Sequence, residues 1–156
     1  MRKNKKRNHQ KHPVPNHKYK DRLFRLVFNN KRDLLDLYNA LNNTCYENPN
    51  DLEVNTLEDA VYLSMKNDIS FLIGGTLNLY EHQSTYNPNM PLRGLIYLAR
   101  LYDGYVETKN INLYSSSLKK LPIPQYFVFY NGTKEQPDET ILQLMDAFES
   151  DRKSVV

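Results

Sequence analysis

The chain has 156 residues, 40% of them hydrophobic, which suits one domain with a core of its own. Its single cysteine, Cys45, excludes a disulfide framework and favours a reducing, cytoplasmic location. No apolar run approaches the roughly 20 residues that span a bilayer, so we expect no membrane partner.

The net charge of +3 hides an asymmetry between the N-terminus and the rest of the chain. Residues 1–18 hold seven basic residues and no acidic one, so the other 138 residues carry +3 less +7, or −4. This arm is poor in apolar residues, and we expect it to be disordered. It can bind nucleic-acid phosphates, with Lys5, Lys6 and Arg7 as candidates, or it is a solubility tail or a product of start-codon choice.

A helical pattern covers residues 19–43, with an interruption at Asn29-Asn30. In the first part, Asp21 stands near the helix start, where a carboxylate suits the helix dipole; the alternative is an acidic group that reaches a metal site. Asn30 is expected to cap the second part. The predicted buried side of that second helix is Leu34, Leu37, Tyr38 and Leu41.

Residues 52–65 predict one or two short strands that lead into a stronger pattern at residues 66–85. There, two apolar runs flank Gly74-Gly75. This predicts a β-hairpin with a two-residue turn, because both glycines adopt positive φ without penalty.

The hairpin register predicts a polar cluster on one face of the two strands, since side chains alternate between faces. Its members are Lys66, Asp68, Glu81 and Gln83. Asp68 faces Glu81, and two facing carboxylates repel unless a cation lies between them. The pair therefore predicts a Mg²⁺ or Mn²⁺ site; the alternative is an ordinary acidic pair on a solvated face. Lys66, opposite Gln83, either assists the chemistry as a cation or points into solvent.

Residues 90–106 predict a helix whose inward side is Leu92, Ile96, Ala99 and Val106. A second stripe, formed by Arg93, Tyr97 and Arg100, suits phosphate contacts or an ordinary solvated face. Residues 125–130, QYFVFY, are typical of a buried central strand. Residues 139–148 predict a further strand or a short helix.

Four stretches together resemble one family: YKDRLFRLVF, NDISFLI, LYEHQST with the following NPNMPLRGLIYLARLY, and FVFYNG. They are similar to the recombination-promoting nuclease (Rpn, putative transposase) branch of the PD-(D/E)XK nuclease superfamily. The resemblance implies an α/β fold with a mixed central sheet flanked by helices, in the order αβββαβ, over residues 19–150. It also implies a metal-dependent DNA endonuclease, with DNA as its partner; a homodimer is one option for the oligomeric state.

The resemblance assigns roles to residues of this chain. Asp68 and Glu81 are implied as metal-binding carboxylates, Asp21 as the acidic residue that completes the site, and Gln83 as the residue at the superfamily's lysine position. The chain departs from the pattern: no proline precedes Asp68, a glutamine replaces the lysine, and the chain ends sooner after FYNG than such relatives do. The alternatives are a catalytically inactive nucleic-acid-binding or interaction domain, or a truncated remnant.

Overall fold

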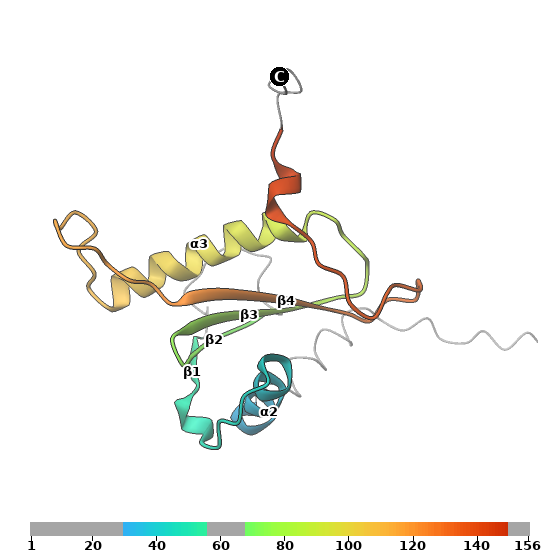
Figure 1. Cartoon of the computed structure of the whole chain (residues 1–156), viewed down its shortest axis with the longest axis horizontal. Coiled ribbons are helices and arrows are strands. Elements are labelled where there is room, and N and C mark those ends of the chain that lie inside the picture. The colour runs from blue at the N-terminus through green and yellow to red at the C-terminus, as the bar shows by residue number, and fades with distance from the viewer. Residues whose placement is uncertain (1–29, 56–67, 150–156) are drawn as a thin grey trace, which may run out of the picture.

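The computed structural model describes residues 30–55 and 68–149. In these residues two α-helices and a four-stranded mixed sheet form an α+β arrangement (Figure 1). The elements in chain order are α2 (Lys31–Asn42), the 3₁₀-helix η1 (Pro49–Asp51), β1 (Glu53–Asn55), β2 (Ile69–Ile73), β3 (Thr76–Gln83), α3 (Met90–Thr108), β4 (Ile123–Tyr130) and the 3₁₀-helix η3 (Leu144–Ala147). No helix in these residues is long and apolar enough to cross a membrane.

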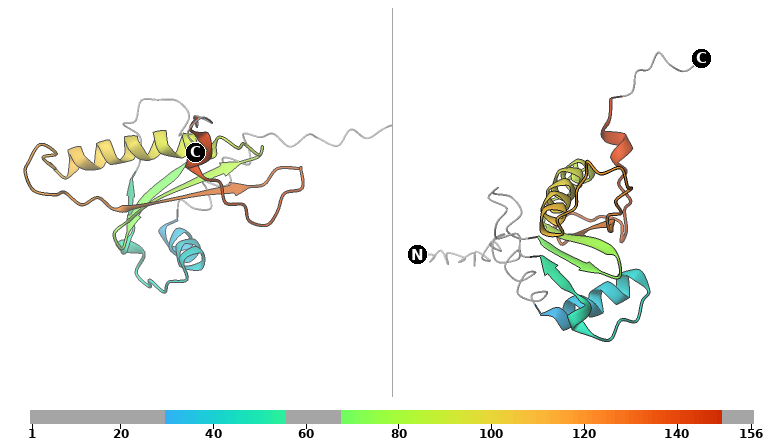
Figure 2. Two further views of the ribbon diagram at one scale, coloured as in Figure 1. Left: turned by 45° about the horizontal axis from the view of Figure 1, so that its top comes forward. Right: turned by 90° about the vertical axis from the view of Figure 1, so that its left-hand side faces the viewer.

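The sheet has the strand order β1-β2-β3-β4. The pairs β1–β2 and β2–β3 are antiparallel, whereas β4 runs parallel to β3. Parallel neighbours need a crossover connection, and α3 supplies it. The two helices lie on opposite faces of the sheet, α2 on one and α3 on the other (Figure 2).

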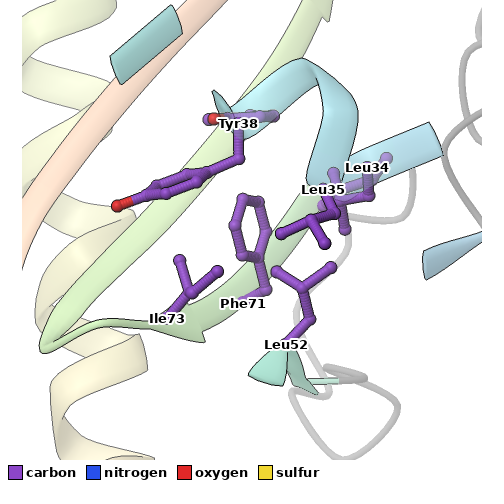
Figure 3. Packing of buried hydrophobic residues seen from close by; sticks show 8 residues of the cluster. Leu34, Leu35, Tyr38, Leu52, Phe71 and Ile73 are labelled. Atoms are coloured by element: carbon purple, nitrogen blue, oxygen red, sulfur yellow. The ribbon is translucent and has the colours of Figure 1, made fainter. Parts of the chain in front are cut away.

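Helix α2 begins as the sequence predicts, because the Asn30 side chain accepts a hydrogen bond from the Arg32 backbone N–H. It packs Leu34, Leu35 and Tyr38 against the sheet (Figure 3). The predicted buried side is right for Leu34 and Tyr38 and wrong for Leu41, which is exposed.

The hydrophobic core between α2 and the sheet, called the α2-side core below, is centred on Tyr80 of β3, which is fully buried. Its ring makes edge-on contacts with Phe71, Phe127 and Phe129, at centroid distances of 5.1, 5.5 and 5.5 Å. Aromatic pairs favour such tilted geometry. Three strands are therefore joined on this face by one aromatic cluster.

On the other face, the inward side predicted for the 90–106 helix is wrong. The residues of α3 that are buried are Met90, Gly94, Tyr97 and Leu101. Leu92 and Ile96 are more than 40% exposed. This helix is apolar on more than one side, so hydrophobic periodicity could not select the stripe that meets the sheet.

The prediction of a buried central strand at residues 125–130 is also wrong. Among the described strands β4 is an edge, and its residues are half-buried or exposed. Its apolar run has a different cause: Phe127 and Phe129 pack toward α2, while Tyr126 packs toward α3. A strand that is covered on both faces reads as continuously apolar wherever it lies in the sheet.

Candidate functional site

The predicted hairpin is confirmed. Gly74 and Gly75 form the turn, with φ of 55° and 81°, and Ile73 pairs with Thr76. Positive φ at both turn positions matches the right-handed twist of the flanking strands.

The hairpin brings Asp68 and Glu81 to the same face of the sheet. The paired register extends to Ile69 and Tyr80, so the next facing pair is Asp68 and Glu81. Ile69 and Tyr80 belong to the α2-side core, which places Asp68 and Glu81 on the α3 side by alternation. The charge of Asp68 also contributes to the raised pKa of Tyr126, a residue of the α3 side.

Glu81 lies at the centre of a buried hydrogen-bonded cluster, and its side chain is 1% exposed. Its Oε1 accepts hydrogen bonds from Arg93 Nη2, at 2.6 Å, and from the Gln83 side-chain amide. Its Oε2 accepts a hydrogen bond from the Tyr126 hydroxyl. A buried carboxylate is tolerated only when it is paired and hydrogen-bonded, and these donors satisfy both conditions.

Arg93 balances the charge of Glu81 and is held by Tyr97. The Tyr97 hydroxyl accepts from Arg93 Nε at 3.3 Å and from Nη2 at 3.1 Å, and the guanidinium lies 5.6 Å from the centre of the Tyr97 ring. Burial by itself lowers the pKa of Arg93. The hydrogen bond to Tyr97 and the charge of Glu81 outweigh that effect and raise the pKa. The arginine therefore stays charged beside the carboxylate.

Tyr126 reaches Glu81 because α3 has a glycine at the crossing point. A β-carbon at Gly94 would lie 2.5 Å from Tyr126 Cδ1, far inside van der Waals contact. Burial raises the pKa of the Tyr126 hydroxyl above its ordinary value, and the hydrogen bond to Glu81 and the charge of Glu81 raise it further. The hydroxyl accordingly remains protonated and serves as a donor.

The structure brings some of the predicted site residues together and separates others. Glu81, Gln83 and Arg93 are joined by hydrogen bonds on the α3 side, and the hairpin register places Asp68 on the same face. The predicted Arg93, Tyr97 and Arg100 stripe is divided: Tyr97 is in the core, whereas Arg100 is exposed. The remaining predicted residues, Asp21, Lys66, Lys5, Lys6 and Arg7, lie outside the described residues.

Sequence reasoning missed Gly94 and Tyr126. By propensity a glycine only weakens a helix, and Tyr126 falls inside an apolar run. One indication was present in the sequence, because a tyrosine whose ring packs into a core needs a hydrogen-bond partner for its hydroxyl. No local pattern, however, identifies a partner that is 45 residues away.

The donor set fits a hard divalent cation only in part. Two carboxylates and the Gln83 amide supply oxygen ligands, which Mg²⁺ prefers. In the described residues there is no group of three or more His, Cys, Asp or Glu side chains that could hold a metal. The Glu81 oxygen Oε1 is already in contact with Arg93. The site therefore contains oxygen ligands of the kind that Mg²⁺ prefers, but in the structure Arg93 is the cation that pairs with Glu81.

Comparisons with protein-family models, curated proteins and solved structures gave no match. The likeness to the recombination-promoting nucleases consequently stays a prediction from the sequence stretches.

Proposed function

We propose that this protein is a metal-dependent DNA endonuclease of the recombination-promoting type, with a PD-(D/E)XK core. The observation that carries the proposal is the register of the β2–β3 hairpin. Continued by one residue beyond Ile69 and Tyr80, it brings Asp68 and Glu81 to one face, and Gln83 lies beside Glu81. The order of the described elements, helix, three strands, helix and strand, supports it as well.

In this proposal Asp68 and Glu81 hold Mg²⁺ or Mn²⁺, and Asp21 is the further acidic ligand expected from the sequence. When bound, the ion supplies a water of lowered pKa and polarises the scissile phosphate. Tyr126 fixes the orientation of the Glu81 carboxylate through Oε2. Gln83 carries no charge and has no useful basicity, so its role is to orient a water by hydrogen bonding.

A plasmid-nicking assay on the purified full chain tests the proposal, with Mg²⁺, Mn²⁺ or EDTA. We expect nicking with either ion, none with EDTA, and none for Asp68→Asn. The matched control is Asp36→Asn, which removes an exposed carboxylate on α2, on the opposite side of the sheet. Nicking by Asp68→Asn at the parental rate would refute the assigned site.

A second candidate function is a non-catalytic DNA-binding domain with the same fold. The specific observation in its favour is that both oxygens of Glu81 already accept hydrogen bonds from protein donors, one of them an arginine. Such a carboxylate is stable without a metal. The same assay separates the two candidates: retained DNA binding without ion binding or cleavage is the result expected for the second.

A further inference from the structure

Arg93 links the buried carboxylate to solvent. Its side chain is 30% exposed, whereas that of Glu81 is 1% exposed. The end of the guanidinium that touches Glu81 is Nη2, and the same atom also donates to Tyr97. A cation that approaches Glu81 Oε1 therefore meets an arginine already in place.

The net charge of the cluster formed by Asp68, Glu81 and Arg93 changes sign when a divalent cation binds. With both carboxylates ionised, Asp68 and Glu81 contribute −2 and Arg93 contributes +1, so the three side chains carry −1 without a metal. A divalent cation adds +2, which gives +1. A charge of +1 complements one phosphodiester, and the only cation among these three side chains is Arg93.

Arg93 has an anchor that does not depend on Glu81. Two of its nitrogens donate to the Tyr97 hydroxyl, and the buried Tyr97 ring lies under the guanidinium. A third contact, from Nη1 to Met90 Sδ, is 3.6 Å long, and a thioether is a weak acceptor. If the contact with Glu81 is lost, the contacts with Tyr97 keep the guanidinium beside the site. Its planar fork suits a phosphate oxygen.

We infer that Arg93 is a counter-cation with two positions. In the absence of metal it pairs with the Glu81 carboxylate, and it competes with a divalent ion for that carboxylate. Once the ion has displaced it, Arg93 binds the DNA phosphate while Tyr97 holds its guanidinium in place. This inference rests on the proposed function and adds to it a regulation of metal entry. Metal and substrate then bind in a linked way, because each one is favoured when Arg93 leaves Glu81.

The test uses the purified full chain and two readouts besides cleavage. One is Mn²⁺ affinity by titration calorimetry; the other is affinity for duplex DNA in Ca²⁺ at fixed salt. Arg93→Gln removes the charge but keeps an amide donor for Glu81, and Arg93→Lys keeps the charge without the fork. Arg32→Gln, an exposed arginine on α2, is the matched control for loss of one positive charge.

For Arg93→Gln we expect Mn²⁺ affinity to rise about tenfold, equivalent to about 1.4 kcal/mol. Its DNA affinity in Ca²⁺ should fall about tenfold or more, as expected for the loss of a charge-assisted contact. Arg93→Lys and Arg32→Gln should keep the parental Mn²⁺ affinity. Tyr97→Phe keeps Arg93 and the core, so it should leave Mn²⁺ affinity unchanged and weaken DNA binding.

Unchanged Mn²⁺ affinity in Arg93→Gln, or unchanged DNA affinity in Tyr97→Phe, overturns the inference. If the parent nicks DNA with Mn²⁺ in that case, the proposed function stands without it. A different result would separate the two proposals the other way. If Arg93→Gln binds Mn²⁺ more tightly but the parent does not nick DNA, the inference on metal entry holds and the proposed cleavage function fails. Absence of Mn²⁺ binding in all variants overturns both.

Discussion

Gly94 of α3 and Tyr126 of β4 lie in direct contact, so that a β-carbon at position 94 would fall 2.5 Å from the tyrosine ring. This close approach lets the Tyr126 hydroxyl reach Glu81 on the neighbouring strand. A helix that carries any larger residue at this point would have to move away from the sheet. The glycine therefore positions the cluster although it has no side chain of its own.

Gly94→Ala should lower stability although alanine is the better helix former. The helix gains about 1 kcal/mol from propensity. The overlap with Tyr126 costs about 1–3 kcal/mol, because the ring or the helix must shift, so the net change is a loss of up to about 2 kcal/mol. Gly104→Ala is the matched control, since a β-carbon at that position would meet no atom within 4 Å and propensity alone acts. Urea unfolding measures both variants, and equal stabilisation of the two would contradict the packing argument.

The stability of the Glu81→Gln variant distinguishes two interactions of Glu81, repulsion by Asp68 and pairing with Arg93. Repulsion between Asp68 and Glu81 predicts that removing the charge leaves the metal-free protein as stable or slightly more so. The observed pairing with Arg93 predicts the reverse, a loss of about 1–3 kcal/mol in the free energy of unfolding. This range lies below the roughly 3–5 kcal/mol of a fully buried pair that loses one partner, because Arg93 is 30% exposed and water can solvate it. Urea unfolding without metal distinguishes the two outcomes.

The same variant tests the metal site through thermal unfolding with and without Mg²⁺. A ligand at 100 times its Kd stabilises the folded state by about 2.7 kcal/mol. We expect the parent to gain melting temperature with Mg²⁺ and Glu81→Gln to gain none. Glu107→Gln, which replaces an exposed glutamate on α3, should respond as the parent does. An equal gain in all three proteins would show that the ion binds elsewhere.

The hairpin turn can be tested by a double-mutant cycle between Gly74 and Tyr46. A β-carbon at Gly74 would overlap the Tyr46 hydroxyl, whereas one at Gly75 would meet no atom within 4 Å. Both positions have positive φ, so each alanine costs roughly 1–2 kcal/mol of backbone strain. Gly74→Ala should cost more than Gly75→Ala in the parent. Tyr46→Phe should reduce the difference but leave part of it, because the ring carbon Cζ would still lie 3.2 Å from the added β-carbon. A difference that is undiminished in the Tyr46→Phe background would exclude the hydroxyl as its cause.

The basic arm should govern DNA affinity and leave the chemistry unchanged. Deleting residues 1–18 removes up to seven phosphate contacts, each of which contributes about −0.9 to the slope of log affinity against log salt. We expect weaker binding and a flatter slope, with the same metal requirement for nicking. Fluorescence anisotropy at several salt concentrations provides the measurement. Identical slopes for the two proteins would assign the phosphate contacts to the folded domain.

Local sequence was sufficient for the features that depend on neighbouring residues. Paired glycines between two apolar runs predict the turn, and the turn determines the register, so the common face of Asp68 and Glu81 follows from residues 68–81 alone. The start of α2 at Asn30 is equally local, because a side-chain cap needs only the next few backbone N–H groups.

The surroundings of Glu81 were decided by the tertiary structure. Its partners Arg93 and Tyr126 are 12 and 45 residues away, and each comes from an element whose burial the sequence pattern misassigned. The inward side of α3 depends on which residues let the helix approach β4, and Gly94 allows that approach by lacking a side chain. Hydrophobic periodicity counts apolar side chains, so it cannot detect a close contact that depends on a glycine having no side chain. The sequence alone therefore determined that two carboxylates share a face, and only the packing of α3 and β4 decided that an arginine and a tyrosine meet one of them.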